Sequence, residues 1–201
     1  MLCVKAEVYF DRIADKYSSM TSSGILGLVK RREKESILRM LSPSRNDLVL
    51  DAGCGSGFYS TLMKGLGASV LGVDISKRMV EIARASGIDA EVGDLGSLKL
   101  KTKFDKILCA GVLEFCEDRL KVMGNLCSHL KEDGCIVFLI PKRSLLGVLY
   151  KLYHLSHGVR VALFSINEMK TQLEGAGLKI VTVEEPTGLS LVIKCIKGLL
   201  K

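Results

Sequence analysis

The sequence has no tryptophan, three prolines and three histidines, and only 5% of its 201 residues are aromatic. A protein that binds single-stranded nucleic acid stacks bases on aromatic side chains, but the strongest basic cluster, Lys30-Arg31-Arg32, has no aromatic residue among its members. No two cysteines form a C-x-x-C pair, and the histidines do not cluster with them, so the usual zinc patterns are excluded and no metal is expected. The seven cysteines are expected to be reduced thiols in a cytoplasmic protein.

Chain length and hydropathy restrict the class of protein further. The length suits one domain with a full core, and a hydrophobic content of 48% excludes a disordered chain. No apolar run approaches the roughly 20 residues that span a bilayer, and charge follows too soon after the start for a secretory signal. The net charge of +7 can attract an acidic substrate, a nucleic acid or an anionic membrane surface, although an ordinary basic surface explains it too. Peripheral contact with a membrane therefore stays open, nucleic acid is disfavoured, and the oligomeric state cannot be deduced.

Apolar runs rich in valine, isoleucine and leucine alternate with helical patterns over residues 48–180. This alternation predicts an α/β fold with a mostly parallel sheet that is buried on both faces. The predicted strands are 47–52, 69–74, 89–92, 104–110 and 135–140, and predicted helices include 77–85 and 166–174. The last two predicted strands, 178–184 and 189–196, have so short a link that they must be antiparallel. All three prolines are expected to lie between elements.

The most specific local signal is the segment from Asp51 to Phe58, where Gly53, Gly55 and Gly57 occupy alternate positions. An apolar run, an acid, the glycines and a helical pattern indicate a strand, a tight loop and a helix. Such glycines let a ligand approach without meeting a Cβ atom. The spacing G-x-G-x-G differs from the dinucleotide fingerprint, and no Gly-Lys-Ser/Thr completes a P-loop. Asp51 would repel phosphate and attract an ammonium or sulfonium group.

Three further segments carry acids or glycines at the ends of predicted strands. Asp74 ends the second strand, where its carboxylate can accept hydrogen bonds from both hydroxyls of a ribose. Gly93-Asp94 follows the third strand, and the fourth leads into the segment 111–115, Gly-Val-Leu-Glu-Phe. Together the four segments resemble the motifs of class I S-adenosylmethionine-dependent methyltransferases of the small-molecule type. Phe115 stands where that family commonly has histidine.

The resemblance implies a Rossmann-like, doubly wound, seven-stranded sheet of order 3-2-1-4-5-7-6 with the last strand antiparallel. It implies one methyltransferase domain over 1–201, with a helical cap (1–41), a cofactor-binding half (42–140), a substrate lid (141–164) and a C-terminal helix and hairpin (165–201). It also implies an enzyme that binds S-adenosyl-L-methionine and releases S-adenosyl-L-homocysteine. The residues expected at the cofactor are Tyr17, Asp51, Ala52, Gly53, Cys54, Gly55, Gly57, Phe58, Asp74, Ile75, Met79, Gly93, Asp94, Leu95, Cys109, Ala110 and Gly111.

The expected acceptor contacts come from the helical cap and from the leucine-rich lid, and they are Tyr9, Tyr150, Tyr153 and Arg160. An ordinary amphipathic helix packed on the sheet explains the lid pattern equally well. Methyl transfer from a sulfonium mainly requires alignment, so a general base is optional, and His154 and His157 are the candidates.

The lid composition favours a small, apolar or aromatic acceptor. The Asn/Asp-Pro-Pro-aromatic loop and the Pro-Cys pair of nucleic-acid methyltransferases are both absent. Methylation of RNA or protein, and a module that binds the cofactor without turnover, remain as alternatives.

Overall fold

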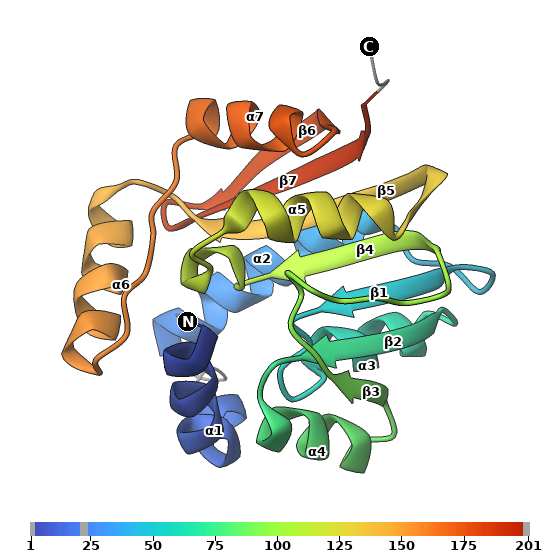
Figure 1. Ribbon diagram of the computed structural model, residues 1–201. Coiled ribbons are helices and arrows are strands. Elements are labelled where there is room, and N and C mark those ends of the chain that lie inside the picture. Colours follow the sequence, from blue (N-terminus) through green and yellow to red (C-terminus); the bar gives the residue numbers. More distant parts are fainter. Residues whose placement is uncertain (1–2, 21–23, 199–201) are drawn as a thin grey trace.

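The computed structural model describes the backbone of residues 3–20 and 24–198 and the side chains of residues 7–15 and 27–198. Its centre is a seven-stranded sheet with helices on both faces (Figure 1). The strands are β1 (Leu48–Ala52), β2 (Ser69–Asp74), β3 (Asp89–Val92), β4 (Phe104–Ala110), β5 (Leu130–Pro141), β6 (Leu178–Thr187) and β7 (Ser190–Lys197). Their order is β3-β2-β1-β4-β5-β7-β6, and β7 is antiparallel to both of its neighbours. The predicted order and the antiparallel last strand are confirmed.

The helices are α1 (Cys3–Met20), α2 (Gly24–Leu41), α3 (Phe58–Gly65), α4 (Lys77–Ala85), α5 (Arg119–Ser128), α6 (Leu145–Ser156) and α7 (Ile166–Gly175), with a short 3-10 turn, η1 (Leu113–Phe115). Consecutive residues of a buried strand face opposite sides of the sheet. Val49 of β1 accordingly joins the core cluster that contains Ile37 of α2 and Met63 of α3. Its neighbour Leu50 joins the cluster that contains Met123 of α5 and residues of α7. The sheet is therefore buried on both faces, as the apolar runs predicted.

Two prolines lie in strands, so the expectation that all three lie between elements is wrong. Pro141 is the last residue of β5, and Pro186 lies near the end of β6. The strand β6 is at the edge of the sheet, and its register against β7 shifts between Glu184 and Thr187. A proline is tolerated at an edge or a bulge because no ladder hydrogen bond is required there. The hairpin link is thus shorter than predicted, residues 188–189.

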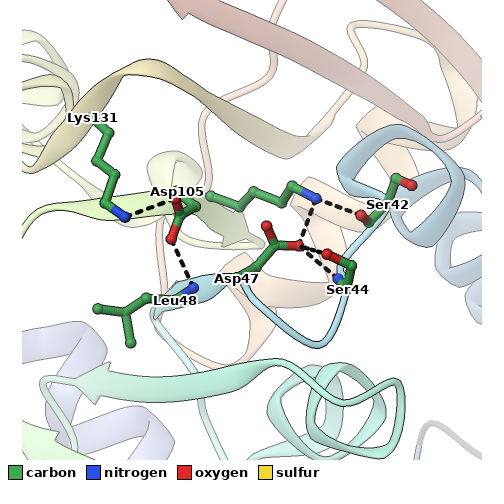
Figure 2. A network of polar contacts seen from close by, with 7 residues as sticks. Ser42, Ser44, Asp47, Leu48, Asp105 and Lys131 are labelled. Atoms are coloured by element: carbon green, nitrogen blue, oxygen red, sulfur yellow. Dashed lines mark hydrogen bonds and ion pairs between the residues drawn. The ribbon is translucent and has the colours of Figure 1, made fainter.

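A network of polar contacts fixes the chain where β1 and β4 begin (Figure 2). The Asp105 carboxylate accepts hydrogen bonds from the Leu48 amide at 2.9 Å and from Lys131 Nζ at 2.7 Å. The bond from Lys131 lowers the pKa of Asp105. Lys106 Nζ lies 2.7 Å from Asp47 Oδ2 in the same network. These contacts stabilise the amino-terminal edge of the sheet, opposite the edge where α/β folds place their ligands.

Between β5 and α7 the chain makes an excursion that carries α6, which stands apart from the other helices at the left of Figure 1. Lys142 and Phe164 form a parallel bridge at its base. The Arg143 amide donates to the Phe164 carbonyl at 2.7 Å. The first turn of α6 is capped by Ser144, whose hydroxyl accepts from the Gly147 amide at 3.1 Å. The excursion thus leaves and rejoins the body at one point.

Candidate functional site

A cavity of about 590 Å³ lies at the carboxyl ends of the central strands, where the sheet order reverses between β1 and β4. Ligands of open α/β sheets bind at such a switch point. One part of its wall is formed by loops that follow β1 to β4, and another by α1, α2, α6 and the β6–β7 turn. It is lined by most of the sequence-predicted residues: Tyr9, Gly53, Cys54, Gly55, Phe58, Asp74, Ile75, Met79, Gly93, Asp94, Leu95, Ala110, Gly111, Tyr150, Tyr153 and His154.

The other predicted residues lie elsewhere, and the role of every predicted site residue stays a prediction. Those that do not line this cavity are Asp51, Ala52, Gly57, Cys109, His157 and Arg160, and Arg160 borders a smaller hollow beside η1. The side chain of Tyr17 lies outside the described residues. Asp51 is buried and accepts a hydrogen bond from the Ser60 hydroxyl at 2.6 Å. Burial raises the pKa of Asp51 to about 6. The hydrogen bond from Ser60 opposes this shift, and the charge of Asp74 adds to it. Asp51 thus joins β1 to α3.

The glycine loop brings backbone close to both the fold and the cavity. At Gly53, with φ +84°, a Cβ atom would lie 2.1 Å from Cγ2 of Val112, so a larger residue would separate the loop from the segment after β4. At Gly55, with φ +52°, a Cβ atom would meet nothing within 4 Å. The Gly55 amide also donates to Asp74 at 2.8 Å, and the Ser76 amide donates to the other Asp74 oxygen at 2.9 Å. Loop and β2 therefore meet at one carboxylate, and burial raises the pKa of Asp74 despite these bonds.

Asp94 occupies a different environment from Asp74 although both line the cavity. It is exposed, and its two carboxylate oxygens accept from the Gly96 amide and the Ser97 hydroxyl, each at 2.9 Å. This is the local turn that Gly-Asp pairs commonly form. Its carboxylate therefore stabilises the loop, which forms part of the cavity lining.

Helix α1 is fastened across this end of the sheet by its acidic residues. The Asp11 carboxylate accepts from the Ser76 hydroxyl and from the Arg78 amide, and Arg78 forms an ion pair with Asp15 at 2.7 Å. These contacts anchor α1 to the amino end of α4. They hold Tyr9 and two neighbouring apolar residues in the cavity wall.

Aromatic rings surround His154. Ring centroids of Tyr9, Phe115, Tyr150 and Tyr153 lie 5.9, 5.7, 4.4 and 5.4 Å from its centroid. Within the described part of the chain its Nδ1 has no hydrogen-bond partner, and burial lowers the pKa of the imidazole to about 4. His154 is therefore neutral near pH 7. It lies beside Phe115, the position at which the resembled family carries histidine.

Two buried carboxyl groups line the cavity near these rings. Glu114 is 4% exposed, and its Oε2 has no hydrogen-bond partner among the residues described. Burial raises the pKa of Glu114 to about 8; the charge of Glu33 acts in the same direction, while Lys30 and a hydrogen bond from Tyr150 oppose it. Glu33 is 7% exposed, and burial raises its pKa in spite of a bond from Ser190. A polar cluster thus faces an otherwise largely apolar chamber.

Sequence reasoning did not assign either carboxyl group to the site. Glu33 lies on the same face of α2 as Ile37 and Leu41, because residues four apart in a helix lie above one another. Ile37 and Leu41 are both fully buried. An acid on an apolar stripe was a usable signal. Other lining residues that were not predicted are Phe10, Ile13, Val29, Lys30, Ser56, Tyr59, Val112, Phe115, Cys116, Val122, Leu139, Ile140, Pro141, Leu146, Leu149, Thr187, Leu189 and Ser190. In the described residues no group of His, Cys, Asp or Glu could hold a metal ion.

Comparisons with known proteins agree with this architecture. A family model described as "Methyltransferase domain" matches residues 27–183. The ubiquinone biosynthesis O-methyltransferase of Pelagibacter ubique is 33% identical over 116 residues, which cover 55% of this chain and 48% of that protein. The mitochondrial ubiquinone biosynthesis O-methyltransferase of Schizosaccharomyces pombe is 32% identical over 122 residues, covering 56% and 44%. The chain thus spans about half the length of these curated relatives.

A solved structure shows the same fold over nearly the whole chain. Magnesium protoporphyrin IX methyltransferase from Synechocystis PCC 6803, with bound SAH, superposes with a TM-score of 0.77 and 20% sequence identity. The match covers 97% of this chain and 99% of that one.

Proposed function

Because the chain belongs to the methyltransferase domain family, we propose that it transfers a methyl group from S-adenosylmethionine to a hydroxyl group of a small, largely apolar acceptor. One observation carries the proposal: a single cavity joins the glycine loop, Asp74 and Asp94 to an aromatic chamber that contains the buried carboxyl of Glu114. The family match and the sheet order agree with the resemblance of the four sequence motifs.

The residues at the loop end of the cavity fit the methyl donor. The open space beside Gly55 accommodates a ligand in contact with the backbone. Both oxygens of Asp74 accept amide hydrogen bonds, and the carboxylate has further acceptor sites for a ribose hydroxyl. Four acidic residues line the cavity, whereas Lys30 is the one lysine or arginine among the described lining residues. This balance favours a sulfonium cation over the phosphates of NAD or ATP.

Glu114 is the group we propose as the proton acceptor. The bound donor supplies an electrophilic methyl carbon; as the acceptor oxygen bonds to it, the bond from that carbon to sulfur breaks and the hydroxyl proton must leave. A general base works best when its pKa is near the operating pH. The pKa of Glu114 is about 8 and that of His154 about 4, so His154 is the weaker base of the two. His157 is exposed and outside the cavity lining.

Two alternatives are less well supported. An RNA acceptor would have to place phosphates at a cavity where a single lysine, Lys30, stands beside four acidic residues among the described lining residues. A module that only binds the donor has no need for a buried, partly unsatisfied carboxyl beside an apolar chamber.

The names of the curated relatives, both O-methyltransferases, support oxygen as the acceptor atom. For location we propose the cytoplasm, because the six described cysteines are unpaired, although one relative is named as mitochondrial.

The test has two stages. Calorimetry should detect binding of S-adenosylhomocysteine but not NAD or ATP, and Asp74→Asn should weaken that binding while leaving the protein folded. Methyl-labelled donor is then offered with apolar phenols and alcohols, with the same compounds already methylated on oxygen, with amines and with RNA. Label in the phenols or alcohols alone supports the proposal. Binding of NAD, or label only in RNA or amines, would contradict it.

A further inference from the structure

The surface of α6 is unusually apolar for an exposed helix. Of its twelve residues only Gly147 and His154 are buried. A helix that is apolar on all sides is normally enclosed, and contiguous exposed apolar patches mark interaction sites. The large apolar side chains of α6 that are more than 40% exposed are Leu145, Leu146, Val148, Leu149, Leu152, Tyr153 and Leu155.

The cavity accounts for only one face of this helix. Leu146, Leu149 and Tyr153 line the cavity wall together with the remaining aromatic residues of α6. Leu145, Val148, Leu152 and Leu155 do not line it, although their exposed fractions are 79%, 43%, 55% and 51%. Their spacing of three, four and three residues places them along one side of the helix. We call these four residues the outer stripe.

The chain segment that carries the outer stripe has basic but no acidic residues. Residues 142–167 contain no aspartate or glutamate, but four basic residues, Lys142, Arg143, Lys151 and Arg160. The first two form ion pairs with acidic residues of the body. No ion pair joins Lys151 or Arg160 to another residue in the described part of the chain. Their charges are therefore available to an anionic partner.

We infer that the outer stripe of α6 docks on a membrane surface that contains anionic lipids. A short apolar helix flanked by basic residues lies in the plane of the lipid interface, where apolar burial and attraction to anionic headgroups add together. No helix in the described ranges is long and apolar enough to cross a bilayer. A symmetric contact between two copies is the less favourable occupant, because it would bring Lys151 of one α6 toward Lys151 of the other.

Docking also has a consequence for the acceptor. This consequence rests on the proposed function, whereas the docking itself does not. The same helix carries the outer stripe and part of the cavity wall. An acceptor dissolved in the bilayer would therefore reach the cavity at the edge of α6 without crossing water. Binding to vesicles and binding of S-adenosylhomocysteine are measured separately, so either idea can fail alone.

The experiment is flotation of the full chain with vesicles of phosphatidylcholine alone or mixed with phosphatidylglycerol. We expect binding to the mixed vesicles, weakened by salt. The variant Leu145→Ser/Leu152→Ser/Leu155→Ser should bind at least about tenfold more weakly, since it removes apolar area from the contact. The matched control, Leu66→Ser/Leu120→Ser/Val181→Ser, alters side chains that are 53%, 49% and 52% exposed elsewhere and should bind like the parent chain.

The contribution of charge is tested with the variant Lys151→Ala/Arg160→Ala, whose affinity for mixed vesicles should fall about tenfold. The control variant Lys77→Ala/Lys170→Ala, which alters two exposed lysines elsewhere, should keep the affinity of the parent chain. Circular dichroism and S-adenosylhomocysteine affinity verify folding, and the single Leu145→Ser variant replaces the triple one if that unfolds. Absence of flotation by the parent chain, or equal losses in variants and controls, would overturn the inference. So would a dimer in solution that the stripe variant abolishes.

Discussion

Replacing Glu114 by glutamine should stabilise the protein at alkaline pH. Burial raises the pKa of this carboxyl from 4.5 to about 8, so the folded state binds the proton more tightly than the unfolded state. Ionisation of the buried carboxyl therefore lowers the free energy of unfolding. This loss of stability is absent below the unfolded pKa, grows as the pH rises, and is complete above the folded pKa. At about 1.4 kcal/mol per pKa unit the shift corresponds to at most about 5 kcal/mol, and we expect about 2–4 kcal/mol after relaxation of the site.

Urea unfolding of both proteins between pH 5 and pH 9 measures this effect. An amide left without a partner costs about 1–3 kcal/mol at every pH, so the quantity of interest is the change in the stability difference with pH. The free energy of unfolding of Glu114→Gln should increase steadily relative to that of the parent chain as the pH rises. Glu117, three residues away and exposed, supplies the control Glu117→Gln, which should show no such trend. A flat difference for Glu114→Gln would refute both the burial of the charge and its proposed chemical role.

Three further outcomes are expected. Asp74→Ala should weaken S-adenosylhomocysteine binding far more than Asp94→Ala, since charged hydrogen bonds contribute about 1.5–3 kcal/mol each and Asp94 is exposed in its own turn; calorimetry giving equal losses would contradict this. Gly55→Val should lose that binding, because its side chain enters open space at the cavity, and should also lose some stability, because its φ of +52° disfavours a β-branched residue; retained affinity in the folded variant would show that the ligand lies elsewhere. Turnover should rise with pH through the pKa of Glu114, and Tyr150→Phe should move the midpoint upward by removing a bond that stabilises the carboxylate; an unmoved pH profile would argue against Glu114 as the base.

Local patterns predicted the central strands well because their physical causes are local. The strands β1 to β4 are short apolar runs ended by acids or glycines, and α4 begins where Ser76 caps it and ends at Ala85 as predicted. The strand β5 was harder, since it begins at Leu130, before a polar stretch that carries no apolar signal. Pairing with β4 extends it, with a register irregularity near Phe104. Neighbouring strands thus override weak local preference.

The candidate site divides in the same way. One end of the cavity consists of loops at strand ends, where the sequence motifs predict the donor contacts, and those contacts stay a prediction. The carboxyl pair could not be deduced, because Glu33 and Glu114 come from distant segments and their raised pKa values result from burial by the assembled fold. The exposure of α6 was equally hidden, since an apolar helical pattern predicts burial and only the bridge at Lys142 and Phe164 reveals an excursion.

Under the proposed function, that excursion makes acceptor choice a separable property of the molecule. With only Gly147 and His154 buried, α6 adds little to the core, and the polar network at the opposite edge of the sheet does not involve it. Apart from Gly147, where a Cβ atom would collide with the Lys142 carbonyl oxygen, residues 145–156 can therefore accumulate substitutions at small cost to folding, and each one facing inward reshapes the chamber. Evolution, or a directed library confined to this helix, can change the range of compounds methylated while the donor end stays constant.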